Sequence, residues 1–121
     1  KMAEKGSMSG FIMEGTRFEG KLEFKQKMRI DGEFHGEMIS DSQLIVGKTA
    51  VIDADVKVHE LKVMGEVRGT IHNCHLLEIM EGGKVLADIE VHTLDIKPGA
   101  IFDGKCTMIS KGHNKAQGVK K

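Results

Sequence analysis

The chain has 121 residues, with 18 Lys and Arg against 18 Asp and Glu, so its formal net charge is zero. This length fits one domain, and no apolar run reaches the roughly 18–20 residues of a membrane-spanning helix. The two cysteines, Cys74 and Cys106, are too few for the disulfide scaffold of a small secreted protein, and no segment reads as a secretory signal. We therefore expect reduced thiols and a cytoplasmic protein.

The zero net charge conceals an uneven distribution along the chain. Residues 110–121 carry four Lys and no acidic residue, and residues 1–9 carry two Lys and one Glu, which leaves 12 basic and 17 acidic residues in 10–109. Both terminal segments are polar, and we expect them to be disordered tails. The acidic body and an aromatic content of 4%, all of it Phe, argue against nucleic acid as a partner.

An internal repeat organises residues 10–109. Met28–Gly32 (MRIDG) reappears as Leu61–Gly65 (LKVMG), at an offset of 33, and a second series with the same offset runs between these segments. The six units begin at Phe11, Met28, Leu44, Leu61, Leu77 and Leu94. Each unit also contains one small residue with an apolar residue two positions before it and another two positions after it, and these small residues are Gly20, Gly36, Ala54, Gly69, Ala87 and Gly104.

The apolar residues of each unit alternate with period two, as in Leu61, Val63 and Val67, which predicts strands rather than helices. A unit of about 16–17 residues is too short for a βαβ element or a propeller blade. The sequence therefore predicts an all-β, parallel β-solenoid of about six coils with a triangular cross-section. The handedness of parallel crossovers favours a right-handed solenoid, and equivalent residues would stack about 4.8 Å apart in a rod roughly 29 Å long.

Three apolar ladders are expected to form the core, with the small residues at a corner or at a crowded inner wall. The ladders are Phe11/Met28/Leu44/Leu61/Leu77/Leu94, Met13/Ile30/Val46/Val63/Ile79/Ile96 and Leu22/Met38/Val56/Ile71/Ile89/Cys106. Residues predicted to be buried within the core are Ile30, Val46, Val63, Val67, Ile71, Ile79 and Ile89.

The two ends of such a solenoid expose an unpaired row of backbone groups and an open section of the core. The sequence contains no helical pattern or polar coil to cover them, and all five Phe lie in the first two coils or the last. The predicted end surfaces comprise Phe11, Met13, Phe18, Leu22 and Phe24 at one end, and Leu94, Ile96, Ile101, Phe102 and Met108 at the other. Two adhesive ends per subunit predict a filament of stacked subunits rather than a closed oligomer.

The repeats resemble those of the bactofilins, a family of bacterial polymer-forming cytoskeletal proteins. The resemblance covers about residues 10–109 and rests on GEFHGEM (32–38), LIVGKTAVIDADV (44–56), LKVMGEVRGTI (61–71), LEIMEGGKVLADIEV (77–91) and LDIKPGAIFDGKC (94–106). It implies a right-handed β-helix that polymerises without nucleotide into filaments without polarity. It also implies a scaffold for cell-shape and cell-wall enzymes under the cytoplasmic membrane, and a role in polymerisation for a Phe near the end of the last coil, which matches Phe102.

A phosphate-binding loop is the first alternative chemistry that the sequence raises. Gly47-Lys48-Thr49 resembles the close of such a loop. However, Ser42 stands where the loop needs another Gly, and residues 50–58 read as a strand instead of the required helix. We expect a corner between strands and no bound nucleotide.

Histidine and cysteine residues raise the possibility of a metal site. His72, Cys74 and His75 lie close in sequence, but a structural zinc site needs four convergent ligands, so a plain turn between coils is the preferred interpretation. His59 and His92 are related by the same offset of 33, which places them two coils and about 10 Å apart, too far to share one ion. We expect no metal ion and no other cofactor.

Two alternatives to a filament remain open. Hexapeptide acyltransferases are also β-solenoids, and IVGKTAVIDADV (45–56) is similar to their repeat, although their coils are longer and carry a catalytic His in a loop. A monomeric module could instead present a flat ladder face to a partner enzyme. The preferred interpretation is a non-enzymatic homopolymer, with cell-wall enzymes and the inner membrane surface as further partners.

Overall fold

The computed structural model describes residues 10–109, which form nine strands and no helix. The strands are β1 (Gly10–Ile12), β2 (Arg17–Phe24), β3 (Met28–Ile30), β4 (Glu33–Val46), β5 (Val51–Val63), β6 (Glu66–Ile79), β7 (Lys84–Ile96), β8 (Ile101–Phe102) and β9 (Cys106–Met108). The two predicted tails, 1–9 and 110–121, lie outside the described residues.

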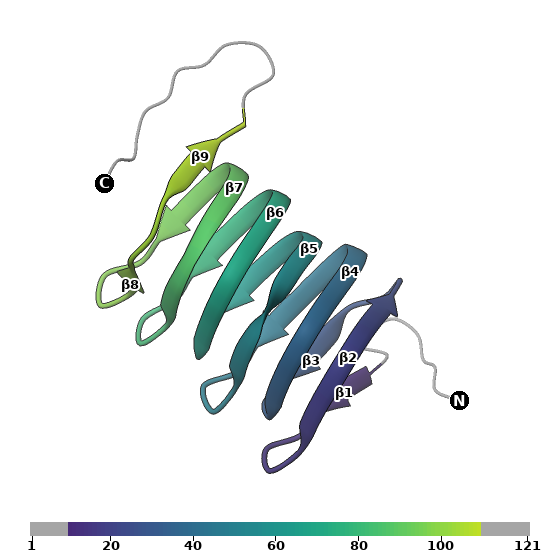
Figure 1. The fold of residues 1–121 in the computed structure, drawn as a ribbon. Coiled ribbons are helices and arrows are strands. Elements are labelled where there is room, and N and C mark those ends of the chain that lie inside the picture. The colour runs from purple at the N-terminus through teal and green to yellow at the C-terminus, as the bar shows by residue number, and fades with distance from the viewer. Residues whose placement is uncertain (1–9, 110–121) are drawn as a thin grey trace.

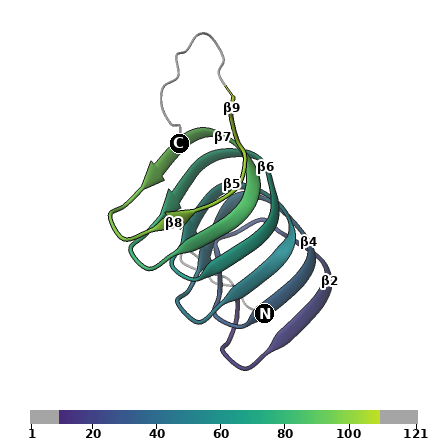
Figure 2. The same cartoon turned by 60° about the vertical axis from the view of Figure 1, so that its left-hand side comes forward.

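The strands wind into a stack of coils (Figure 1). Neighbouring strands are parallel and follow the order β1-β3-β4-β5-β6-β7-β8, with β2 beside β4 and β9 beside β7. The predicted all-β parallel solenoid is confirmed, and the chain makes about five turns where about six coils were expected. Figure 2 shows the coil of β8 and β9 at one end of the stack and β2 at the other.

The long strands are continuous because each bends around a corner without leaving the sheet. In β5 the pairing with β6 holds from Val51 to Val56, shifts, and resumes at Glu60. The coils are closed by turns of four residues, as between Val46 and Val51, or of two, as between Val63 and Glu66. Apolar residues at alternate positions on both sides of these corners therefore point into one common core.

The ladder that begins at Leu22 is confirmed along its whole length, since Leu22 pairs with Met38 and the register continues to Cys106. The other two ladders are confirmed from the second coil onward. The seven residues predicted to be buried in the core are at most 2% exposed: Ile30, Val46, Val63, Val67, Ile71, Ile79 and Ile89.

The register of the first coil differs from the sequence expectation. Ile12 pairs with Ile30 and packs against the core, whereas Phe11 pairs with Arg29 and Met13 is 61% exposed. The placement of Phe11 and Met13 on the ladders was therefore wrong. The prediction assumed that equivalent residues of the first and second coils have the same spacing in sequence as those of later coils. However, the corner between Phe24 and Met28 holds one residue more than the corner of the third coil, which shifts the first strand by one position.

The small residues stack in register on neighbouring coils, as the repeat predicts: Gly20 pairs with Gly36, and the column continues through Ala54, Gly69 and Ala87. Gly36 has φ 132°, a conformation that L side chains rarely adopt. A Cβ at this position would also collide with the carbonyl oxygen of Gly20. The column therefore allows neighbouring coils to approach closely.

We expect Gly36→Ala to lower the free energy of unfolding by about 1–3 kcal/mol, because strain and collision act together. Gly20→Ala is the matched control: Gly20 has a similar φ of 135°, but a Cβ there would meet only the Phe18 ring, at 3.8 Å. Urea denaturation followed by circular dichroism measures both. Equal losses of stability would show that the collision contributes nothing.

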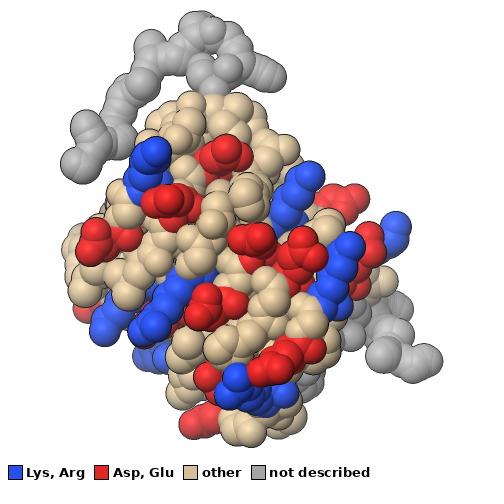
Figure 3. Space-filling view, in the orientation of Figure 1, with Lys and Arg blue, Asp and Glu red and all other residues tan. Residues whose placement is uncertain are grey.

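The outward-facing side chains of the long strands are largely charged. Figure 3 shows both signs intermingled over the surface. Ion pairs join residues two apart on one strand, such as Arg17 with Glu19 and Arg68 with Glu66. Exposed pairs of this kind contribute about 0–1 kcal/mol each, so the apolar ladders rather than the surface charges hold the coils together.

Candidate polymerisation surfaces

The N-terminal end surface is formed by β1 and β2. Each of these strands pairs on one side only, β1 with β3 and β2 with β4. The ring of Phe18 on β2 stacks on the ring of Phe34 in the next coil, with centroids 5.1 Å apart and planes 7° apart. Phe34 is fully buried, whereas Phe18 is only half-buried, because no described strand covers it.

The C-terminal end surface is formed by β8, β9 and the last residues of β7. Phe102 pairs with Val85, and Met108 pairs with Val91. Val85 and Val91 are fully buried, whereas Phe102 and Met108 are only partly buried. Ile96 and Ile101 are 44% and 47% exposed. Side chains of the same columns are therefore fully buried within the stack and only partly buried in the last coil.

Partly buried apolar residues gather at the two ends of the core. Those packed against the core are Ile12, Phe18, Leu22, Phe24 and Met28 near the first coil, and Leu94, Ala100, Phe102, Cys106 and Met108 in the last. Six of the ten residues predicted for the end surfaces are in this set, and the structure does not describe the side chain of Phe11. Ile12 was missed because its register follows from the longer first corner.

The two cysteine thiols have different environments, and both are free. The Cys74 thiol is buried and donates a hydrogen bond to the backbone oxygen of Leu76 at 3.2 Å. Burial raises the pKa of Cys74 to about 12. Cys106 lies on the edge strand β9, where partial burial raises its pKa as well. Cys106 therefore reports on whether the C-terminal end surface is covered.

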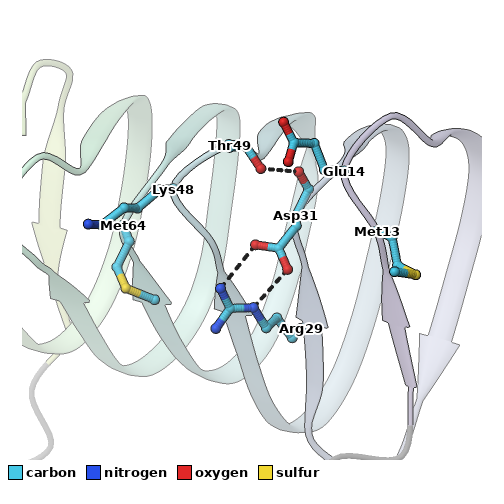
Figure 4. A pocket seen from close by; sticks show the side chains of 7 residues that line it. All are labelled: Met13, Glu14, Arg29, Asp31, Lys48, Thr49 and Met64. Atoms are coloured by element: carbon cyan, nitrogen blue, oxygen red, sulfur yellow. Dashed lines mark hydrogen bonds and ion pairs between the residues drawn. The ribbon is translucent and has the colours of Figure 1, made fainter.

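The Gly47-Lys48-Thr49 corner lies beside an open hollow of about 570 Å³ (Figure 4). Its floor is an ion pair in which Arg29 donates two hydrogen bonds to the Asp31 carboxylate, at 2.8 and 3.1 Å. The Thr49 hydroxyl donates to the backbone oxygen of Asp31 at 2.7 Å. The corner is followed by strand β5, as the sequence indicates, rather than by the helix that opens a phosphate-binding site.

Three histidine side chains lie side by side on neighbouring coils. The ring of His75 is stacked on that of His59 and tilted against that of His92, so these three side chains form one column. Among residues 10–109, no three His, Cys, Asp or Glu side chains are grouped so as to hold a metal ion. No helix able to span a membrane occurs in the same residues.

Comparisons with known proteins identify relatives of this chain. A family model named Bactofilin, described as polymer-forming cytoskeletal, matches residues 10–107. The chain is 30% identical to Bactofilin BacP of Myxococcus xanthus (strain DK1622) over 89 residues, which are 74% of this chain and 37% of BacP. It is 26% identical to Bactofilin BacO of the same organism over 93 residues, which are 77% of this chain and 74% of BacO.

The fold is also similar to that of a chain in a cryo-EM reconstruction of Thermus thermophilus bactofilin double helical filaments. The TM-score is 0.73 at 22% sequence identity, over 81% of this chain and 97% of that chain. The chain spans only 37% of the length of BacP. With the family model covering nearly all of residues 10–109, the chain belongs to the bactofilins, a family of polymer-forming cytoskeletal proteins with a structural rather than an enzymatic role.

Proposed function

We propose that this chain assembles end to end, through its two end surfaces, into filaments that have no polarity and need no nucleotide. The filaments would act as a scaffold for cell-shape or cell-wall enzymes under the cytoplasmic membrane. Of the alternatives, the acyltransferase-like enzyme is excluded by membership of a structural family. The homopolymeric filaments of the family favour a polymer over a monomeric module.

The open core at each end is the observation that carries the proposal. Phe18 and Phe102 each lie at the end of a column whose inner members, including Phe34 and Val85, are fully buried. Complete burial of one such side chain contributes about 1.5–3 kcal/mol to association. Several of these side chains become buried together when two ends meet. Within residues 10–109, β2 and β9 pair with a strand on one side only, and the backbone groups on their other side supply further bonding capacity.

A filament without polarity requires like ends to meet, N-terminal with N-terminal and C-terminal with C-terminal, since head-to-tail stacking gives a polar filament. Apolar contact and strand pairing at these ends do not depend on phosphate groups, which supports assembly without nucleotide. The membrane part of the proposal is supported by the four Lys in residues 110–121, since each Lys near an anionic surface contributes about 1 kcal/mol. Filaments that fail to float with vesicles containing phosphatidylglycerol would contradict the membrane part alone.

Thiol labelling tests whether assembly covers the C-terminal end surface. At pH 8 we expect a thiol reagent to modify Cys106 faster in dispersed subunits than in pelleted filaments. Cys74 is the internal control: its pKa of about 12 keeps the thiol protonated at this pH, so it should react slowly in both samples. Equal labelling of Cys106 in filaments and dispersed subunits would contradict end-to-end assembly through this surface.

A further inference from the structure

A column of three histidines crosses three consecutive coils and takes no part in the filament contacts proposed above. His59 precedes Glu60, which pairs with Leu76, so His59 of β5 lies beside His75 of β6. The pairs formed by Cys74 and Leu76 with β7 place His75 beside His92 in the same way. We call His59, His75 and His92 the histidine ladder.

The rings of the histidine ladder lie close together, one pair stacked and the other tilted. The centroids of His59 and His75 are 4.8 Å apart with planes 1° apart, and those of His75 and His92 are 5.6 Å apart with planes at 41°. His59 and His75 are exposed and His92 is half-buried. The ring nitrogens of this column are therefore accessible to a ligand from solvent.

The backbone at the corner explains why the imidazoles face outward. Asn73 has φ 49°, and the pairing of β6 with β7 shifts register between Ile71 and Cys74. This geometry turns the Cys74 thiol into the core, where it lies 3.7 Å from the backbone oxygen of His59. Cys74 is thus directed away from the ladder, and the imidazoles are the donors available on its outer side.

Imidazole is the most common protein ligand for transition metals and suits Cu²⁺, Ni²⁺ and Zn²⁺. Zinc–nitrogen bonds measure about 2.0–2.1 Å, so two nitrogens on one ion lie at most about 4 Å apart. Rings on adjacent coils have centroids 4.8 Å apart, so the side chains bring two nitrogens onto one ion by rotating out of the parallel stack until their in-plane lone pairs converge. His59 and His92 lie two coils apart, so these two side chains alone do not hold one ion.

We propose that the histidine ladder is a surface site for a divalent transition-metal ion, held by ring nitrogens from two adjacent coils, with His75 as the ligand common to both possible pairs. Water completes the coordination, because the described residues provide no group of three converging ligands. The ion links neighbouring coils and stabilises the solenoid by mass action. This site is independent of the end surfaces, so its failure would leave the filament proposal unaffected.

A Cu²⁺ titration of the full chain, followed by electron paramagnetic resonance, tests the site. We expect one saturable site with two coordinating nitrogens. His75→Asn removes both pairs and should abolish it, whereas His59→Asn leaves the pair of His75 and His92, and His92→Asn leaves the pair of His59 and His75. The His59→Asn and His92→Asn variants should each retain a two-nitrogen site. The variant that combines His59→Asn with His92→Asn should lose it.

Two control variants address histidines outside the ladder. His72→Asn and His113→Asn should both bind Cu²⁺ like the unchanged chain. Melting of each variant without metal, followed by circular dichroism, verifies that the fold is retained. Undiminished binding by His75→Asn, loss of the site in His113→Asn, or no saturable binding by the unchanged chain would each overturn the proposal.

Discussion

Val67→Asp is expected to unfold the subunit. Val67 is fully buried in the middle of the stack, between Ile52 and Val85 on the neighbouring coils. An unpaired carboxylate at this position loses its hydration and gains no partner, which costs several kcal/mol. That cost is a large fraction of the roughly 5–15 kcal/mol by which a domain is stable, so the β-sheet signal in circular dichroism should be lost or melt at a far lower temperature.

Leu86→Asp is the matched control for Val67→Asp. Leu86 lies on the adjacent coil, next to Val85, but its side chain is not among the buried core residues and its backbone pairs with Arg68. A carboxylate there remains hydrated beside a cation, so the melting temperature should change little. A stable, folded Val67→Asp variant would contradict the assignment of this row to the core.

Phe102→Arg is expected to abolish filaments and leave the subunit folded. Phe102 lies in the C-terminal end surface, where it pairs with Val85 and is only partly buried. A guanidinium in a subunit on its own stays in contact with water, whereas in an assembled end contact it would be desolvated without a partner. Sedimentation should show loss of the polymer, while circular dichroism should show an unchanged fold.

The size of the dispersed Phe102→Arg species separates two modes of assembly. If like ends meet, the intact N-terminal ends should still pair and give dimers; monomers would contradict the absence of polarity but not end-to-end contact. Phe102→Leu keeps an apolar side chain and should keep the filaments. If Phe102→Arg unfolds as Val67→Asp does, the distinction between core and end surfaces is wrong.

Much of the fold was predictable because one physical constraint recurs in every coil. Parallel strands in register place equivalent residues on top of one another, so a repeat of buried positions such as Val46, Val63 and Ile79 appears directly in the sequence. The column of small residues followed from the same stacking. The first coil was not predictable from a constant period, because the extra residue between Phe24 and Met28 shifts the register there.

The histidine ladder shows what a search for equal spacing overlooks. His59, His75 and His92 each stand two residues before a core leucine: Leu61, Leu77 and Leu94. That common position was visible in the sequence, but a comparison at one fixed offset linked only His59 with His92. Successive coils differ in length, so neighbouring coils are found only by aligning their core positions.

Negative-stain electron microscopy of the purified chain, with nucleotide removed enzymatically and metal ions removed by chelation, tests the central claim most directly. An open core at both ends and edge strands without partners predict thin filaments under these conditions, and their number should not change when nucleotide is restored. Discrete single particles at the same protein concentration, or filaments that appear only after nucleotide is added, would contradict assembly through the end surfaces alone.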